Sequence, residues 1–330
     1  MNRWRQLLAK ADRFTTGIII SVILGLALPC SGGVAEAFDW LTNAAIILLF
    51  YLYGVKLSRE SVIAGLLNWR LQSMVLLFTF AFFPIVIPLL RPLFEPLVGA
   101  ALYSGLVYVA CLPSTVQSSI AFTSVAGGNV PAAVCSASVS SLLGVFLTPM
   151  LVGILFSHSG SCGADIGIDT ILKICYQILL PFVLGQCSRR WLKDWVAGHK
   201  NLISWNDQTT IWLVIYTSFS GATVSGYWEH LDAFRLGGLI VICAIILSLT
   251  YAATYYSSKA LGFCREDRIT IVFCGSKKSL AVGAPMMLAI FGHLDNNLLL
   301  PLMIFHQVQL MTCAQLARLW HKQGADNGGY

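Results

Sequence analysis

The sequence predicts an all-α integral membrane protein. Of its 330 residues, 57% are hydrophobic and only 11% are charged, and the mean hydropathy is +0.74. Water-soluble domains carry roughly 25% charged residues, so this chain has too few polar groups to cover a surface in water. The composition also argues against a disordered chain and a disulfide-held secreted module. Its ten cysteines lie mostly in apolar runs and show no metal-site spacing.

Ten segments are apolar and long enough to be candidate membrane-spanning helices. Crossing the hydrocarbon layer takes about 20 mostly apolar residues, at about 1.5 Å of rise each. We number these predicted helices 1 to 10, and they cover residues 14–28, 40–55, 71–90, 98–126, 131–156, 168–185, 209–225, 236–256, 269–291 and 297–316.

Positively charged residues set the expected orientation, because Lys and Arg are enriched in cytoplasmic loops. With the N-terminus inside, sixteen of the 21 Lys and Arg residues lie in cytoplasmic segments, and only Arg91 and Arg235 lie in connections on the other side. The remaining three, Lys173, Lys277 and Lys278, lie inside predicted helices. We therefore expect both termini to be cytoplasmic, in an inner (plasma) membrane. This orientation explains the net charge of +6 without a nucleic-acid partner.

Two segments that lie five helices apart resemble each other. Residues 111–121 (CLPSTVQSSIA) in helix 4 are similar to residues 274–281 (CGSKKSLA) in helix 9. An odd number of spans per repeat makes two halves antiparallel, which is the inverted-repeat plan of secondary transporters. We therefore predict one membrane domain, residues 1–330, with repeat one at about 14–156 and repeat two at about 168–316.

Helices 4 and 9 carry the candidate binding site. Pro113 removes a backbone donor in the middle of helix 4, and Gly275 precedes a polar stretch with two lysines roughly 12–15 Å deep in helix 9. Because interrupted helices at equivalent positions mark transporter sites, we expect both helices to be broken and to cross there. The candidate site residues are Ser114, Thr115, Gln117, Ser118, Ser119, Ser276, Lys277, Lys278 and Ser279, with His306, Gln307 and Gln309 of helix 10 as weaker candidates.

A lysine near the bilayer centre needs a cavity or a partner, because inserting it costs roughly 2.5–3.5 kcal/mol. All fifteen acidic residues lie in connections or near helix ends. The expected partners are therefore backbone carbonyls, the polar side chains of helix 4, or an anionic substrate. Two simpler interpretations stay open. Helix 9 could begin later, so that both lysines extend to the interface. The polar residues of helix 10 could only hydrogen-bond between helices, which is the interpretation we favour for them.

Residues 111–149, CLPSTVQSSIAFTSVAGGNVPAAVCSASVSSLLGVFLTP, resemble the helix 4 and 5 signature of the bile acid:sodium symporter family. Residues 53–57 (YGVKL) resemble its Gly-Leu-x-Leu stretch after helix 2, and residues 274–285 take the place of its second broken helix. The resemblance covers nearly the whole chain and is greatest to the divergent SBF-like bacterial branch, which carries a Ser-Lys-Lys-Ser-Leu motif. It implies ten helices, a core domain of helices 3, 4, 5, 8, 9 and 10, a panel domain of helices 1, 2, 6 and 7, and alternating access between them.

The sequence departs from this family where typical members bind sodium. Those members use a Ser-Asn pair in helix 4, a Ser and a Thr in helix 5, and a Glu with a Gln in helix 9. The corresponding positions here are Ser118 and Ser119, Ala133 and Ala137, and a neutral residue between Val272 and Gly275 that is followed by lysines. Sodium coupling therefore does not carry over, and we expect one of the two lysine ammonium groups to take the place of sodium. Because burial disfavours a charged lysine, proton coupling is a further option. No cofactor is expected.

The sequence thus predicts a secondary transporter of an organic or amphipathic anion. It shows no nucleophile with a base, no phosphate loop and no zinc cluster, so an enzyme is not expected. The expected partners are the lipid bilayer and the anion. The alternative is a membrane regulator or sensor that retains the fold without transport.

Overall fold

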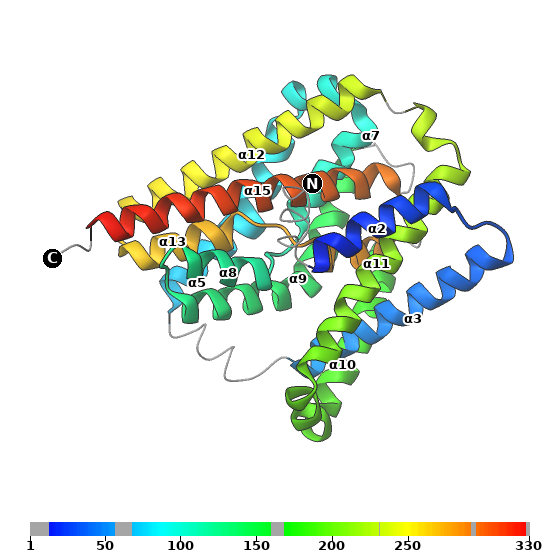
Figure 1. Cartoon of the computed structure of the whole chain (residues 1–330), viewed down its shortest axis with the longest axis horizontal. Coiled ribbons are helices and arrows are strands. Elements are labelled where there is room, and N and C mark those ends of the chain that lie inside the picture. Colours follow the sequence, from blue (N-terminus) through cyan, green and yellow to red (C-terminus); the bar gives the residue numbers. More distant parts are fainter. Residues whose placement is uncertain (1–12, 57–67, 160–167, 231, 292–294, 328–330) are drawn as a thin grey trace, which may run out of the picture. The chain divides into compact units, whose positions relative to one another are not determined.

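The computed structural model describes residues 13–56, 68–159, 168–230, 232–291 and 295–327. Within these ranges every regular element is a helix, as the sequence predicts (Figure 1). In chain order the helices are α2 (Arg13–Ala27), α3 (Gly33–Lys56), α5 (Trp69–Leu77), η1 (Phe78–Phe82), α6 (Phe83–Leu89), α7 (Arg91–Cys111), α8 (Gln117–Val125), α9 (Val130–Ser159), α10 (Ile168–Gly198), α11 (Lys200–Val224), η2 (Tyr227–His230), α12 (Ala233–Ala260), α13 (Arg265–Gly275), α14 (Leu280–Phe291) and α15 (Asn296–Asn327).

The chain divides into two compact units. Unit 1 consists of Met1–Lys56, Pro181–Leu231 and Met287–Asn296, and unit 2 consists of Leu57–Leu180, Asp232–Met286 and Asn297–Tyr330. Every residue of the predicted site therefore belongs to unit 2.

Unit 1 is held together by close helix packing. Helix α11 packs along α2 and α3. Helix α3 also crosses α10 at two glycines, because a Cβ added at Gly54 or at Gly185 would overlap the main chain of the other helix. Small residues at such crossings let two membrane helices approach closely.

Six helical stretches among the described residues are long and apolar enough to cross a membrane: Gly33–Val55, Trp69–Leu89, Arg91–Cys111, Val130–Phe156, Ala233–Ala260 and Asn296–Gln323. Predicted helix 1 is not among them because α2 has only 15 residues. Predicted helix 9 is divided into α13 and α14, which have 11 and 12 residues. Predicted helices 6 and 7 correspond to α10 and α11 and are not among these six stretches. The ten-helix inverted repeat therefore stays a prediction.

Several helices extend beyond the apolar segments that predict them. Helix α10 ends at Gly198 and α11 begins at Lys200, so helical structure continues through the basic segment expected to connect them. Helix α15 similarly continues to Asn327. The physical reason is that hydrophobicity marks only the part of a helix that lies in hydrocarbon, whereas backbone hydrogen bonding continues into polar surroundings.

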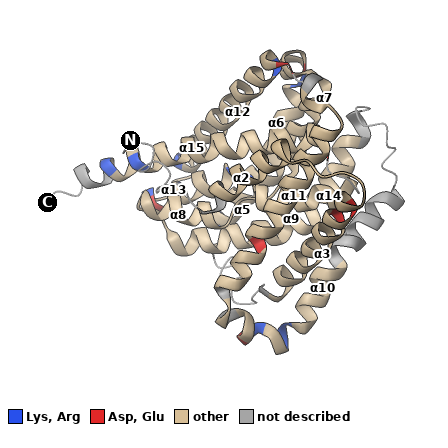
Figure 2. Cartoon of the chain, turned by 45° about the vertical axis from the view of Figure 1, so that its right-hand side comes forward, with Lys and Arg blue, Asp and Glu red and all other residues tan. Residues whose placement is uncertain are grey.

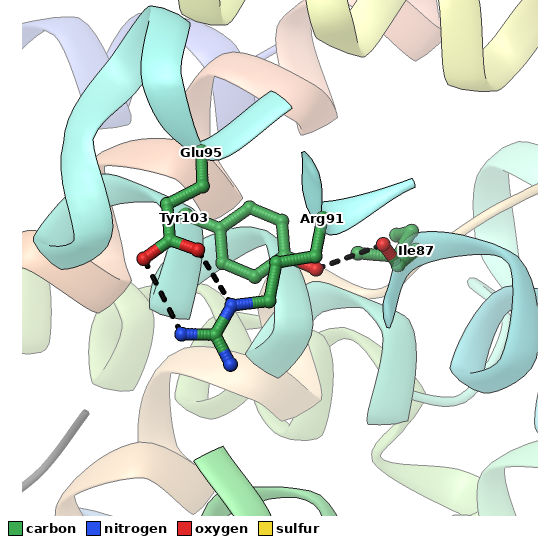
Figure 3. A network of polar contacts seen from close by, with 4 residues as sticks. All are labelled: Ile87, Arg91, Glu95 and Tyr103. Atoms are coloured by element: carbon green, nitrogen blue, oxygen red, sulfur yellow. Dashed lines mark hydrogen bonds and ion pairs between the residues drawn. The ribbon is translucent and has the colours of Figure 1, made fainter. Parts of the chain in front are cut away.

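Helix α7 begins at Arg91 rather than near residue 98, and charged residues mark its start. Figure 2 shows long stretches of helix that carry no Lys, Arg, Asp or Glu. At the start of α7, Arg91 Nε and Glu95 Oε2 lie 2.5 Å apart (Figure 3). The Tyr103 hydroxyl donates to the Ile87 carbonyl at 2.8 Å and ties α7 to α6. Between these contacts Gly99 interrupts the helix with a φ of 82°, a conformation that glycine adopts readily.

Candidate functional site

The helical run from α7 to α8 is broken at residues 112–116, where the sequence predicts a break. Pro113 has no N–H with which to continue the helix. Its ring packs against Gly144 of α9, where an added Cβ would lie 2.6 Å from the Pro113 Cβ. Glycine at position 144 therefore lets the broken segment lie directly against α9.

Side chains of α9 satisfy main-chain groups that the break exposes. The Thr148 hydroxyl donates to the Cys111 carbonyl at 2.8 Å, and the Ser114 N–H donates to the Ser140 hydroxyl at 3.0 Å. The hydrocarbon layer holds no water to bind such groups, so a broken membrane helix requires partners of this kind.

The run from α13 to α14 is broken at residues 276–279, and the two breaks contact each other. The Ser279 N–H donates to the Pro113 carbonyl at 2.9 Å. The Ser114 hydroxyl donates to the Cys274 carbonyl at 2.6 Å. The two interrupted segments therefore meet inside unit 2, near the positions that the sequence indicates.

Lys278 is fully buried, and its ammonium makes three hydrogen bonds. Nζ donates to the carbonyls of Thr79 at 2.7 Å, Ala110 at 2.7 Å and Leu112 at 2.8 Å. It also lies 4.3 Å from the centre of the Phe83 ring. An ammonium has three N–H donors, so each donor of Lys278 has an acceptor. The side chain thereby joins η1 to the end of α7.

The Thr79 carbonyl is available because η1 is a π-helical turn. In an α-helix the N–H of Phe83 would donate to the Thr79 carbonyl, but here it donates to the Phe78 carbonyl. In a π-helix the donor to the Thr79 carbonyl would be the N–H of residue 84, which is a proline and has none. The local sequence therefore leaves a buried acceptor for Lys278.

The other two carbonyls are available because α7 ends at Pro113. In a continuous helix the Ala110 carbonyl would accept from the N–H of Ser114, but that N–H donates to α9. The Leu112 carbonyl would accept from residue 116, which lies beyond the end of the helix. Pro113 therefore frees two of the three carbonyls that accept from Lys278.

Gln309 of α15 binds the main chain of Lys278 on both sides. Its Oε1 accepts from the Lys278 N–H at 2.9 Å, and its Nε2 donates to the Lys278 carbonyl at 2.8 Å. The same Nε2 lies 3.0 Å from Nδ1 of His306, which is buried beside it. Gln307 is only half-buried. Gln309 therefore hydrogen-bonds between elements, as the simpler interpretation of helix 10 expects.

Lys277 is equally buried but has a different environment. In the part of the chain that the structure describes, its Nζ has no hydrogen-bond partner. It lies 4.2 Å from the centre of the Phe122 ring and 5.6 Å from that of Phe273. Ring faces attract a cation by about 0.5–2 kcal/mol, which is less than the cost of burying an unpaired amine. Because neither lysine is exposed, the interpretation in which both extend to the interface is wrong.

A row of aromatic side chains extends from Lys277 through buried Phe273 to half-buried rings in unit 2. The ring centres of Phe122 and Phe273 lie 6.1 Å apart, those of Phe273 and Trp320 lie 5.4 Å apart, and those of Trp320 and Tyr255 lie 6.2 Å apart. Lys277 therefore lies at one end of an apolar aromatic row.

The structure brings most of the predicted hydroxyls of helix 4 together. Thr115 Oγ1 lies 2.7 Å from Ser118 Oγ and 3.2 Å from Ser119 Oγ. The Ser119 hydroxyl also donates to the Phe273 carbonyl at 3.3 Å. The Gln117 side chain is exposed and lies outside this cluster.

The predicted hydroxyls of helix 9 make local contacts. The Ser276 hydroxyl donates to the Val272 carbonyl at 2.5 Å, one turn back. The Ser279 hydroxyl accepts from the Val282 N–H at 3.2 Å, at the start of α14. Both groups therefore help to end one helix segment and begin the next.

Sequence reasoning missed the contribution of α9 and η1. None of the site residues predicted from the sequence lies on α9. Ser140, Gly144 and Thr148 are spaced four residues apart, however, and so share one helix face, which would have been a usable signal. Thr79 contributes its main chain, and no side-chain pattern indicates that role.

A second polar region lies between α5 and α9. It is a cavity of about 210 Å³, lined by Asn68, Leu71, Gln72, Asn129, Pro131, Ala132, Cys135 and Ser136. Pockets for drug-sized ligands are larger, about 300–1,000 Å³, and none of the predicted site residues lines this one. Among the described residues, no group of three or more His, Cys, Asp or Glu side chains could hold a metal ion.

Apolar spans, two interrupted helices that meet and two buried lysines are together typical of a membrane transporter. The family comparison agrees with this class. The chain belongs to the SBF-like CPA transporter family, whose model matches residues 12–322.

Individual relatives support this assignment. The uncharacterized protein PA2026 of Pseudomonas aeruginosa is 50% identical over 316 residues, which cover 96% of this chain and 94% of the relative. YfeH, a candidate symporter of Escherichia coli strain K12, is 48% identical over 314 residues, which cover 94% and 93%. Sodium/bile acid cotransporter 7 of Mus musculus is 30% identical over 311 residues, which cover 92% and 90%. The protein is therefore a membrane transporter of small molecules in a lipid bilayer and not an enzyme.

Proposed function

We propose that this protein is a secondary transporter that carries an organic or amphipathic anion across an inner (plasma) membrane by alternating access. In this proposal the chain forms ten spans in two inverted repeats, and both termini are cytoplasmic. The observation that carries the proposal is Lys277, a fully buried amine with no hydrogen-bond partner in the described residues.

The two adjacent lysines have different roles in this proposal. Lys278 has acceptors for all three donors, so an anion would have to compete with three carbonyls for it. The Lys277 amine has no acceptor among the described residues, and burying it unpaired is costly unless a ligand binds it in part of the transport cycle. The carboxylate or sulfonate of a substrate would supply that ligand.

The aromatic row supports an amphipathic substrate. Phe122 and Phe273 flank the Lys277 amine, so a molecule whose charged group binds the amine would place its apolar body against these rings. Such a molecule gains hydrophobic contact as well as charge pairing. A small inorganic anion would gain only the charge pairing.

The test is a thermal-shift screen of the purified protein against organic anions. Each anion has a neutral analogue, such as the amide of a carboxylic acid, and the series varies the apolar body. A ligand that binds the folded state raises Tm. We expect amphipathic anions to raise Tm and their neutral analogues to have little effect. The gain should be lost in Lys277→Met and kept in Gln117→Ala, which alters an exposed residue.

Flux is then measured in proteoliposomes with the most strongly stabilising anion, with and without sodium and proton gradients. Uptake by the wild type and its loss in Lys277→Met would support the proposal. Binding without uptake would favour the regulator or sensor. Equal stabilisation by anions and neutral analogues would contradict an anion site at Lys277.

A further inference from the structure

The environment of the Lys278 ammonium has the composition of a site for a monovalent cation. Three carbonyl oxygens lie 2.7, 2.7 and 2.8 Å from Nζ, and the Phe83 ring lies on another side. Unwound backbone carbonyls are the groups with which membrane proteins coordinate monovalent metal ions. Here the cation that they surround belongs to the protein itself.

The three acceptors exist for reasons independent of Lys278. Pro84 and the π-helical turn free the Thr79 carbonyl, and Pro113 ends α7 at Cys111, so that the carbonyls of Ala110 and Leu112 are not used within the helix. All three belong to buried main chain, where an unpaired carbonyl is costly. The fold therefore requires a cation or another strong donor at this point.

The chain around the two breaks offers no carboxylate, because residues 104–126 and 268–286 contain neither Asp nor Glu. A metal ion at the breaks would thus have neutral main-chain oxygens and hydroxyls as its ligands.

We propose that the ammonium of Lys278 is a built-in cation that takes the place of a bound metal ion at the two breaks, so that this part of unit 2 holds together without sodium. Lys278 is then a positioning residue that fixes η1, the end of α7 and the 276–279 segment. The proposal concerns how the Lys278 ammonium supports the fold, and it does not depend on which substrate the protein carries.

The test combines sodium dependence with chemical rescue. The Tm of the wild type should be the same in sodium, potassium and choline chloride at equal ionic strength. Lys278→Ala should lower Tm by about 5 °C or more. Ammonium, ethylammonium or sodium should restore part of that loss, because each can enter the space that the side chain leaves. Choline, which is too large, should not.

Two control variants separate this role from simple packing. Lys277→Ala removes the neighbouring amine, and its Tm should not respond to small cations. Lys278→Met keeps the volume of the side chain without its charge, so its Tm should be lower than that of the wild type and should not respond to added cations. A residue that only filled space would tolerate methionine.

Three results would overturn the proposal. The first is a rise in the Tm of the wild type with sodium relative to choline. The second is a Lys278→Met variant as stable as the wild type. The third is a folded Lys278→Ala variant whose Tm no small cation changes. If Lys278→Ala yields no folded protein, the wild-type titration and Lys278→Met still decide the question.

Discussion

The main-chain N–H of Ser279 donates to the carbonyl of Pro113 at 2.9 Å, and this bond joins the two broken segments of unit 2. Because α7 ends at Cys111, the Pro113 carbonyl lies outside the helix. It accepts from the second break, and the Ser114 hydroxyl donates in return to the Cys274 carbonyl, so each interruption supplies what the other lacks.

The Ser114 hydroxyl holds the end of α13 through the Cys274 carbonyl. Ser114→Ala leaves that buried carbonyl without its donor, so we expect the free energy of unfolding to fall by about 1–3 kcal/mol. The measurement is Tm in detergent, compared with Gln117→Ala, whose exposed side chain should change Tm little. Equal Tm values for the two variants would mean that the hydroxyl does not support the break.

Gly144 lies against the ring of Pro113. Gly144→Ala places a methyl group where a rigid ring already lies, so we expect a loss of about 1–3 kcal/mol from overpacking. Gly237→Ala on α12 is the matched control, because its Cβ would meet no atom within 4 Å. If both substitutions shift Tm alike, helix propensity rather than contact with Pro113 governs position 144.

Lys277 contributes little to stability, because its amine is buried without a hydrogen bond in the described residues. Replacing it by methionine removes a desolvated polar group at similar volume. We therefore expect the Tm of Lys277→Met to equal or exceed that of the wild type while its anion binding is lost, which is the pattern of a residue kept for function. A clear fall in Tm would instead indicate a structural role for this lysine.

Gln309 exchanges two hydrogen bonds with the main chain of Lys278. Gln309→Met leaves a buried N–H and a buried carbonyl unpaired, and we expect a cost of about 2–4 kcal/mol. Gln309→Glu keeps an oxygen that can accept from the Lys278 N–H but loses the donor to the Lys278 carbonyl. Its Tm should therefore lie between those of the wild type and Gln309→Met. Gln307→Met, two residues earlier and half-buried, provides the control, and a loss as large as that of Gln309→Met would contradict the assignment.

The proposed orientation is tested by labelling cysteines in intact cells, in a background without the native cysteines. Asn2→Cys and Asn327→Cys should resist an impermeant thiol reagent, because both ends are expected in the cytoplasm. Ser31→Cys, in the connection between α2 and α3, should be labelled from outside. Strong external labelling at either terminus would reverse the topology.

Local features of the sequence determined the helical class, the positions of most helices and the two breaks. Hydrophobicity over about 20 residues is a local property, and so is the missing N–H of Pro113. Both features can therefore be recognised from the sequence without knowing which residues lie close in space. The identification of 114–119 and 276–279 as polar segments of interrupted helices rests on the same kind of signal.

Lys277 and Lys278 differ in the hydrogen bonding of their amines, and the tertiary structure alone decided this difference. The two residues are adjacent and chemically identical, and both lie in the non-helical segment 276–279. The carbonyls that bind Lys278 lie 199, 168 and 166 residues away in the sequence. The Thr79 carbonyl is free to accept only because it lies in a π-helical turn that is followed by Pro84. Long-range main-chain contacts leave no side-chain pattern, so only the folded chain determines which amine has hydrogen-bond acceptors among the described residues and which does not.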